Sequence, residues 1–188
     1  MILDTIQAIT TRYSCRAFND QIPTNDELAV IARAAVASPS AVNRQPWRVI
    51  VVKNKALLAE LEAEGMKNLA ATDQATYERI LSRGGKLYYS APCMVIIPIP
   101  KNVPAGSEVF DCGIVSENIA LSATALGIES LICGLASFSF AGEKGAEFKQ
   151  RLGFPEGYDI GIAVLLGHAQ NPGGTPHEPD LSKISWVE

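Results

Sequence analysis

Two short apolar runs constrain the fold of this chain more than any other feature. Residues 93–99 and 160–166 are rich in Ile, Val and Leu, and each is far shorter than the roughly 20 residues that span a bilayer. Pro92 precedes the first run, and both runs are most simply interpreted as buried strands. Between them, residues 110–126 are apolar on most faces and precede Gly127, which predicts a helix covered on nearly all sides.

Further helices and strands are expected on both sides of these runs. Thr24 is followed three residues later by Glu27, the capping-box form that opens a helix, and Pro39 stops that helix. The other expected elements are helices at 2–10, 57–61, 75–81 and 143–152, a strand at 48–53, and a strand or loop at 131–135. Because helices and strands are mixed rather than strictly alternating, the predicted class is α+β or α/β, with three layers in one domain.

The C-terminal segment 168–188 is too rich in Pro and Gly to form a domain of its own. Its end, Ile184-Ser185-Trp186-Val187, carries apolar side chains that need a surface to cover. Such a tail either frays or wraps a neighbour. The predicted organisation is therefore one domain at 1–167 and a tail at 168–188.

Composition argues against several classes of protein. The chain has 16 basic and 20 acidic residues and a net charge of −4, which does not favour binding to nucleic acid. The first residues, with Asp4, lack the basic region of a signal peptide, so we expect a cytoplasmic protein that does not engage membranes. Four cysteines without a CxxC pair and two histidines predict no metal site. The hydrophobic fraction of 47% suits either a large subunit interface or a well-filled core.

The first candidate site is the segment 12–16. Arg12, Ser14 and Arg16 alternate along the chain, so in an extended backbone their side chains point the same way. Two guanidinium groups flanking a hydroxyl, with no acid in the segment, offer the donors that a phosphate needs. The alternative is an exposed basic turn, which the charge pattern by itself favours.

The second candidate site is the loop 38–47. Its two prolines stiffen the backbone, while two serines, an asparagine and a glutamine present donors and acceptors without net charge. Such a loop suits a planar heterocycle with carbonyl groups and ring nitrogens. A helix-to-strand connector around a buried Trp47 is an equally good interpretation of the loop by itself.

The sequence leaves the roles of Cys15, Asp111 and the segment 86–89 open. Cys15 lies between two arginines, so it either has a depressed pKa and some reactivity or packs beside the site. Asp111 lies inside the predicted buried helix and needs a partner that the sequence does not name. The segment 86–89, Lys-Leu-Tyr-Tyr, either lines a pocket or simply packs.

In this order, the segments resemble the FMN-dependent nitroreductase family. The resemblance rests on Arg12-Tyr13-Ser14-Cys15-Arg16-Ala17-Phe18, on Ser38-Pro39-Ser40, Asn43 and Gln45-Pro46-Trp47, and on the strand directly behind them. The later order is also similar, with 113–127, Gly134, a helix, Leu152-Gly153-Phe154-Pro155 and a strand ending at Gly167. The resemblance implies an α+β fold, a three-layer α/β/α sandwich, in a homodimer whose subunits intertwine and whose tails embrace the partner.

The resemblance also implies roles for particular residues. Arg12 would bind the FMN phosphate, Ser14 the phosphate or ribityl chain, and Arg16 the pyrimidine edge around N1 and O2. A backbone amide near Cys133-Gly134 would donate to flavin N5, and the loop would reach the flavin held mainly by the other subunit. The implied cofactor-binding residues are Arg12, Tyr13, Ser14, Arg16, Pro39, Ser40, Ala41, Asn43, Gln45, Cys133, Gly134, His177 and Lys183. No protein nucleophile and no metal ligand is implied.

The tail departs from the family pattern. The family usually carries a Lys or Arg pair there, which completes the phosphate site. In this chain residues 168–177 hold His168 and His177 but no Lys or Arg, and Lys183 comes late. Phosphate binding would therefore depend on Arg12 together with His177 or Lys183.

The implied activity is the transfer of electrons from NAD(P)H, by way of FMN, to small electron-poor acceptors such as nitroaromatics and quinones. The kinetics would be ping-pong, and the chain has no G-x-G-x-x-G fingerprint of a dedicated dinucleotide site. The alternatives are a flavin-binding protein reduced by a partner protein such as ferredoxin, a relative specialised in reductive dehalogenation or flavin fragmentation, and a relative that has lost FMN.

Overall fold

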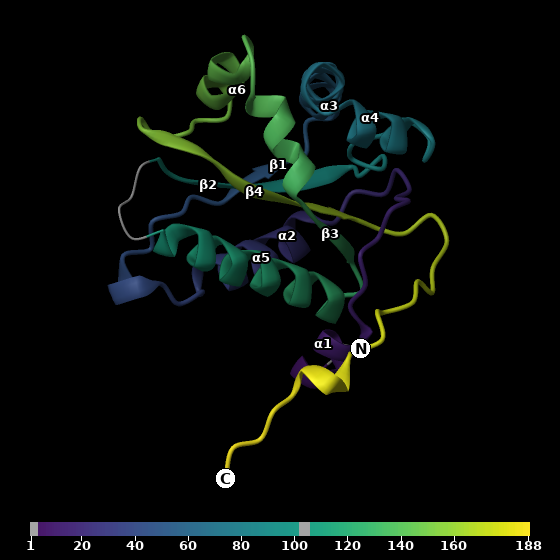
Figure 1. The fold of residues 1–188 in the computed structure, drawn as a ribbon, viewed down its shortest axis with the longest axis vertical. Helices are drawn as coiled ribbons and strands as arrows, with labels where there is room; N and C mark the ends of the chain where they lie inside the picture. The colour runs from purple at the N-terminus through teal and green to yellow at the C-terminus, as the bar shows by residue number, and fades with distance from the viewer. Residues whose placement is uncertain (1–3, 102–105) are drawn as a thin grey trace.

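Four antiparallel strands form the middle layer of the structure. The computed structural model describes residues 4–101 and 106–188. The strands are β1 (Ile50–Val52), β2 (Cys93–Pro100), β3 (Glu129–Cys133) and β4 (Tyr158–Gly167), and they lie in the order β1-β2-β4-β3. Helices cover both faces of this sheet (Figure 1), so the structure has the three predicted layers.

The central strands β2 and β4 are the two apolar runs of the sequence, and they pair with each other along the whole of β2. Residues 93–98 are buried without exception, because helices lie on both sides of the sheet. The register shifts between Ile97 and Pro98. A bulge at this point accommodates a residue that has no N–H to give to a central strand.

The side chains of β2 alternate between two hydrophobic cores. Cys93, Val95 and Ile97 face one core, and Met94 and Ile96 face the other. The first core is closed by α2 (Asn25–Val36) and α5 (Ser107–Ala125). The second is closed by α3 (Lys55–Thr72), α4 (Gln74–Leu81), α6 (Gly145–Arg151) and the 3-10 helix η2 (Gly134–Phe140). The predicted buried strands are therefore confirmed, with one core on each face.

Local capping signals set the predicted ends of two helices. The Thr24 hydroxyl accepts the Glu27 N–H at 3.3 Å, and the Glu27 carboxylate accepts the Thr24 N–H at 2.7 Å, which confirms the capping box of α2. α2 ends at Val36, before Pro39 is reached. Gly127 follows α5 with φ of 75°, a left-handed conformation that glycine adopts without strain.

Other elements differ in extent from the prediction. The first helix is α1 (Thr5–Thr11), and the start of the predicted helix 2–10 lies outside the described residues. β1 has three residues instead of the predicted six at 48–53. α3 has 18 residues, although only 57–61 showed a helical pattern. Its length is explained by packing along η2 rather than by its own periodicity, since tertiary burial supplies most of the stability of a helix in a protein.

One face of α5 is open in the single chain. The side chains of Val109 and Phe110 are 68% and 76% exposed, so the prediction of a helix covered on nearly all sides is wrong for this chain alone. On α1, Ile6 is likewise 68% exposed. The apolar pattern of the sequence was correctly detected, but it does not tell whether the same chain or another molecule covers it.

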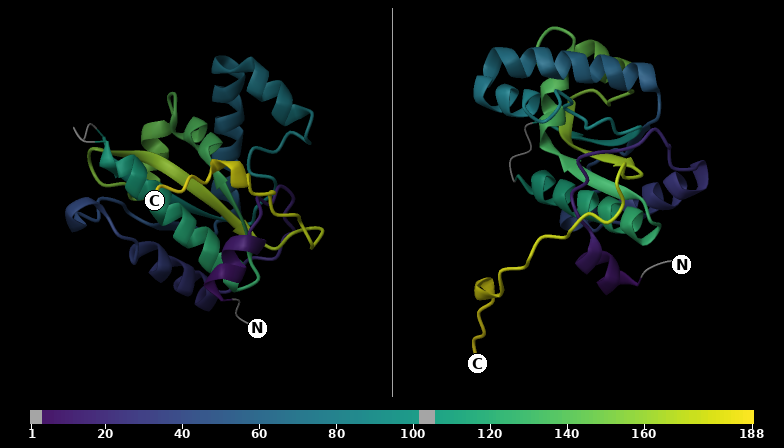
Figure 2. Two further views of the ribbon diagram at one scale, coloured as in Figure 1. Left: turned by 60° about the horizontal axis from the view of Figure 1, so that its bottom comes forward. Right: turned by 90° about the vertical axis from the view of Figure 1, so that its right-hand side faces the viewer.

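The C-terminal segment has two parts. Residues 168–174 lie against the body of the molecule, where the Gln170 N–H donates to the Ala17 carbonyl at 2.9 Å and Gly174 packs on the ring of Tyr13. Beyond residue 174 the chain runs away from the body (Figure 2), and its Trp186 is 87% exposed. We call residues 175–188 the free tail. No described helix is both long and apolar enough to cross a bilayer.

Candidate cofactor site

The segment 12–18 is held in an extended form along the edge of the sheet. Ser14 forms a parallel bridge with Ser130 of β3, and the Cys15 N–H donates to the Ser130 carbonyl at 3.0 Å. Phe18 forms a second bridge, to Ala169 beyond β4. The side chain of Cys15 is buried in the core, so the alternation of an extended segment turns its neighbours Ser14 and Arg16 to the other side, where Ser14 is half-buried and Arg16 is exposed.

Ser14 and Arg16 offer donors without an opposing acid. The Arg16 guanidinium donates to the Ser14 carbonyl at 3.3 Å, so the guanidinium lies beside the Ser14 backbone. In the described part of the chain no carboxylate forms an ion pair with Arg16, and its side chain is exposed. An arginine in this setting is free to bind an anion from outside the chain.

Arg12 differs, because an acid approaches it from α5. Its Nε lies 3.5 Å from a Glu117 carboxylate oxygen, an ion pair that lacks hydrogen-bond geometry. The segment itself contains no acid, as the sequence shows, but the tertiary fold brings one to it. Arg12 Nε is buried and makes no hydrogen bond with any described residue, so this donor is still available to a ligand.

The end of β3 adds a backbone donor on the same edge. Gly134 starts η2, its N–H has no acceptor among the described residues, and a Cβ built on Gly134 would meet nothing within 4 Å. Since Ser130 pairs with Ser14, Gly134 lies about 13 Å of extended chain further along this edge. We call Ser14, Arg16 and Gly134 the donor strip.

Neighbouring side chains in this region are structural. Burial raises the pKa of the Cys133 thiol to about 11, and it outweighs the N–H groups of Ala136 and Leu135 that favour the thiolate. Burial also raises the pKa of Cys15, so the interpretation of Cys15 as an activated thiol is wrong. In the segment 86–89, the Tyr88 hydroxyl is buried in a hydrogen bond with Ser139, while Lys86 and Tyr88 both line a cavity.

The loop 38–47 has a strained and specific shape. Val42, Asn43 and Gln45 all have positive φ, at 48°, 55° and 47°. Asn43 adopts this region at little cost, whereas Val42 and Gln45 each cost about 1–2 kcal/mol. The Ser40 hydroxyl accepts the Gln45 N–H at 2.8 Å, and the Asn43 side chain accepts from the Gln45 amide at 3.0 Å. Pro39 and Asn43 are exposed. These internal bonds tie Gln45 to Ser40 and Asn43, and the side chains of Asn43 and Gln45 are exposed, whereas Ser38 is buried.

Asp111 finds its partner in this loop. One of its carboxylate oxygens accepts the Ala41 N–H at 3.2 Å, although the side chain lies on α5 and is 4% exposed. Sequence reasoning marked Asp111 as a buried acid but could not connect it to a position 70 residues earlier. Glu117, the partner of Arg12, was missed altogether because nothing in the sequence around it signals that contact.

The structure does not bring all the expected site residues together within one chain. The loop lies beside the start of α5, whereas the segment 12–18 runs along the β3 edge on the opposite side of the molecule (Figure 1). His177 and Lys183 lie on the free tail, and neither makes a hydrogen bond or ion pair with Arg12 among the described residues. Lys183 instead pairs with Asp180 at 3.7 Å.

The fold and these residues define the class of the protein, an α+β sandwich with hydrogen-bond donors exposed along one edge of its sheet. The nitroreductase family model matches residues 9–168. A nitroreductase from Desulfitobacterium hafniense, solved with bound FMN, is 50% identical, with a TM-score of 0.94 and 100% of both chains covered. The chain belongs to the nitroreductase family, as the sequence resemblance predicted.

Two further relatives extend the comparison. A nitroreductase from Bacteroides fragilis, also solved with bound FMN, is 25% identical, with a TM-score of 0.86 over 99% of this chain and 100% of that one. A relative from Archaeoglobus fulgidus is provisionally named an NADH dehydrogenase/NAD(P)H nitroreductase. It is 28% identical over 170 residues, which is 89% of this chain and 87% of its own length.

Proposed function

We propose that the protein binds FMN and, as a homodimer in the cytoplasm, passes electrons from NAD(P)H to small electron-poor acceptors such as nitroaromatics and quinones. The observation that carries the proposal is the donor strip, in which the Arg16 guanidinium forms no ion pair with a carboxylate of residues 4–101 or 106–188 and lies beside the Ser14 hydroxyl and the Gly134 N–H at one edge of the sheet. The relative that is 50% identical over the full chain was solved with FMN, which supports the same cofactor.

The donor strip and Arg12 fit the parts of FMN. Arg12 and Ser14 would hold the phosphate and the ribityl chain, and the buried, unbonded Nε of Arg12 is a donor that an anion would satisfy. Gly134 would donate its N–H to N5 of the ring. FMN, when bound, supplies the site that takes up and releases two electrons. Arg16 would place a permanent cation at the pyrimidine edge, which favours the reduced, more negative ring.

The homodimer is supported by surfaces that a single chain leaves open. The exposed apolar side chains of α1 and of the first turns of α5 need a cover, and so do those of the free tail. We propose that a second copy covers them, that the tail wraps that copy with His177 or Lys183 near its phosphate site, and that the loop 38–45 contacts the partner's FMN. This arrangement would bring together the loop and the donor strip, which one chain keeps apart.

The proposed electron donor and nitro acceptor are supported by the name of the archaeal relative. The sequence has no G-x-G-x-x-G fingerprint of a dedicated dinucleotide site. With no separate dinucleotide site, NAD(P)H and the acceptor would use the same place in turn, which predicts ping-pong kinetics. The competing hypothesis is that a partner protein, rather than NAD(P)H, reduces the FMN.

The deciding experiment is the visible spectrum of the purified protein after addition of FMN and desalting, before and after anaerobic NADH or NADPH. A retained flavin spectrum that bleaches is the expected result. A flavin that is retained but not bleached would replace NAD(P)H by a partner protein as the electron donor. Loss of the flavin on desalting would contradict FMN binding and, with it, the proposed function.

The phosphate contact is tested by Arg12→Ala. Loss of a charge-assisted bond of about 1.5–3 kcal/mol should weaken FMN binding by about 10–100-fold in a fluorescence titration. Arg33→Ala, on the exposed side of α2, is the matched control and should bind FMN normally. Unchanged affinity in Arg12→Ala would remove Arg12 from the phosphate site.

A further inference from the structure

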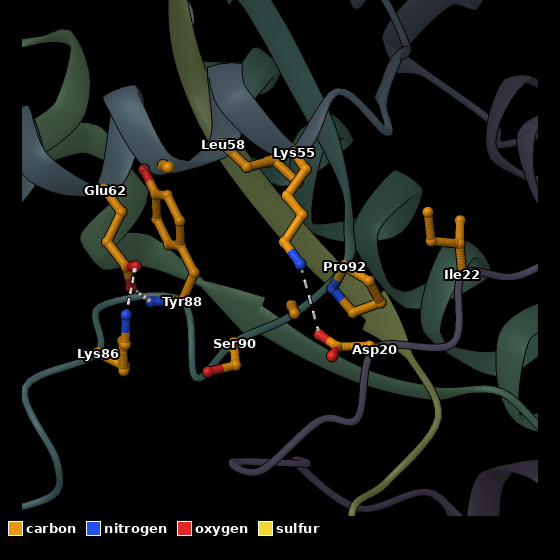
Figure 3. A pocket seen from close by; sticks show the side chains of 11 residues that line it. Asp20, Ile22, Lys55, Leu58, Glu62, Lys86, Tyr88, Ser90 and Pro92 are labelled. Carbon is orange, nitrogen blue, oxygen red and sulfur yellow. Dashed lines mark hydrogen bonds and ion pairs between the residues drawn. The ribbon is translucent and has the colours of Figure 1, made fainter.

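A second site lies on the α3 side of the sheet, in a cavity of about 220 Å³ (Figure 3). It lies between the first half of α3, the segment 86–92 and the segment 20–22. Lys55 and Glu62 mark its two ends, and Leu58, Ala59 and Pro92 line its middle. The volume is below the roughly 300–1,000 Å³ of drug-sized ligand sites, so the cavity suits a small molecule.

The middle of the cavity is apolar. Leu58 and Ala59 come from α3 one turn beyond Lys55, and Pro92 closes the opposite side (Figure 3). The Tyr88 ring lies against the cavity, while its hydroxyl is turned into the core toward Ser139. This surface accepts the apolar body of a ligand but offers it no polar contact.

One end of the cavity carries Lys55, whose ion pair with Asp20 is long and exposed to solvent. Lys55 lies 3.8 Å from Asp20, which is too long for a hydrogen bond, and the two side chains are 89% and 94% exposed. A surface pair of this kind contributes little and is readily exchanged. Lys55 is also the first residue of α3, an 18-residue helix whose N-terminus favours a negative charge. An anionic group of a ligand can therefore replace Asp20 at Lys55.

The other end carries an acceptor that is fixed in place. A Glu62 carboxylate oxygen accepts the Tyr88 N–H at 2.9 Å, and the other lies 3.8 Å from the Lys86 ammonium. The Glu62 side chain is only 18% exposed, whereas that of Lys86 is 58% exposed. Glu62 is therefore held in the wall of the cavity, where it can accept a hydrogen bond from a ligand.

The turn beside Glu62 is strained in a way that shapes the cavity. Tyr89 and Ser90 have φ of 52° and 62°, and the Ala91 N–H donates to the Tyr88 carbonyl at 2.8 Å. This geometry normally selects Asn-Gly, which adopts positive φ at little cost. The serine at this position places a hydroxyl at the cavity (Figure 3), and backbone strain of this kind clusters at functional sites.

We propose that this cavity binds a small carboxylic acid with an apolar body and a hydrogen-bond donor at its far end. The carboxylate binds Lys55 at the start of α3, the body covers Leu58 and Pro92, and the donor bonds to Glu62. The Ser90 hydroxyl contacts the ligand between these two ends. No residue of the donor strip lines this cavity, and the proposal does not depend on FMN.

The test is a titration of the full-length protein with 4-hydroxybenzoate, followed by amide chemical shifts and by calorimetry. The acid should bind with shifts confined to residues 55–62 and 86–92, and more tightly than either benzoate or 4-hydroxybenzyl alcohol. Lys55→Gln should weaken binding of 4-hydroxybenzoate by about fivefold and leave the affinity for 4-hydroxybenzyl alcohol unchanged. Lys67→Gln is the matched control, because Lys67 pairs with Glu64 on the same helix at 3.4 Å, and it should have no effect.

A second variant separates ligand binding from folding. Ser90→Gly relieves the left-handed strain, so it should raise the thermal midpoint while it weakens 4-hydroxybenzoate binding. Equal affinity for the acid in Lys55→Gln and the unmodified protein would overturn the proposal. Amide shifts outside residues 55–62 and 86–92, or no binding of 4-hydroxybenzoate up to about 10 mM, would also overturn it. FMN retention, measured on the same samples, shows separately whether the proposed redox function holds.

Discussion

At the scale of single residues, the alternation of side chains along the segment 12–16 both buries Cys15 in the core and turns Ser14 and Arg16 outward. Cys15 enters the core, where its backbone N–H is bonded to Ser130, and this contact fixes the direction of its neighbours. Ser14 and Arg16 are consequently turned outward, where Arg16 meets no described acid. A guanidinium remains charged throughout the physiological pH range, so Arg16 is a constant electrostatic influence on whatever binds beside it.

This leads to a prediction for the redox potential of bound FMN. Arg16→Gln should lower the two-electron potential by about 20–60 mV, equivalent to about 1–3 kcal/mol, because the reduced ring loses a neighbouring cation. FMN affinity should fall by less than in Arg12→Ala. Spectroelectrochemistry measures the shift, with Arg33→Gln as the control. An unshifted potential would displace Arg16 from the pyrimidine edge.

A second residue-scale prediction concerns Asp159 and pH. Its carboxylate accepts from Lys149 at 2.7 Å, from Lys101 at 2.9 Å and from the Ile160 N–H at 2.8 Å. Burial acts to raise the pKa of Asp159, but these contacts outweigh it and lower the pKa below its ordinary value. A lowered folded-state pKa means that the stabilisation is present above the ordinary pKa and is lost as pH falls through the folded value.

Asp159→Asn should therefore lower the urea midpoint at pH 7, and the difference from the unmodified protein should shrink below about pH 4. Urea unfolding at a series of pH values measures it. Glu156→Gln removes an exposed acid that has no described ion pair and should change the midpoint little. A difference that stays constant down to pH 2 would show that the effect of Asp159→Asn is not electrostatic.

At the scale of elements, α5 holds the strained loop in place from several points. Asp111 accepts the Ala41 N–H, Asn118 donates to the Ser38 hydroxyl at 2.8 Å, and Glu108 lies 3.6 Å from Arg44. The loop could not keep three residues at positive φ by its own internal bonds without support from outside. The helix is therefore the scaffold that sets where the loop projects.

Asp111→Ala should lower the thermal midpoint by about 2–10 °C, since it removes a buried hydrogen bond worth about 1–3 kcal/mol. It should also weaken FMN binding, although Asp111 belongs to neither the donor strip nor the phosphate site. Asp111→Asn keeps an acceptor oxygen and should restore most of both properties. Calorimetry and FMN titration give the two readouts. Normal FMN affinity in Asp111→Ala would show that the loop does not contribute to the cofactor site.

At the scale of the whole molecule, the free tail, α1 and α5 all carry apolar side chains that the single chain leaves uncovered. The apolar side chains of the tail are exposed in the single chain, as are those of the two helices. α1 and the free tail lie on the same side of the molecule (Figure 1), so they can serve the same interface. The proposed second copy would cover all three.

Removal of residues 176–188 should loosen the homodimer. Burial of even two apolar tail side chains is worth about 3 kcal/mol, so the dissociation constant should rise by at least about 100-fold. The cut leaves Gly174 on Tyr13 and the bonds of 168–170 intact, so the fold should be preserved. Sedimentation equilibrium measures the change, with deletion of Glu188 alone as the control. A truncated dimer as tight as the full one would contradict the embracing tail.

Local chemistry in the sequence determined much of the fold. The apolar runs predicted β2 and β4, Thr24 and Glu27 predicted the start of α2, and Gly127 predicted the end of α5. Each of these signals depends on neighbours a few residues away, which a sequence displays directly. The order of the segments was enough to indicate the nitroreductase family, which the comparison confirms.

Contacts between distant residues were decided only by the tertiary structure. The pairing of Arg12 with Glu117, the bond from Ala41 to Asp111 and the cavity between Lys55 and Lys86 all join segments far apart in the chain. The length of α3 also depends on what it packs against rather than on its own pattern. Sequence periodicity reports which side of an element is apolar, whereas its partner is set by the packing of the whole chain.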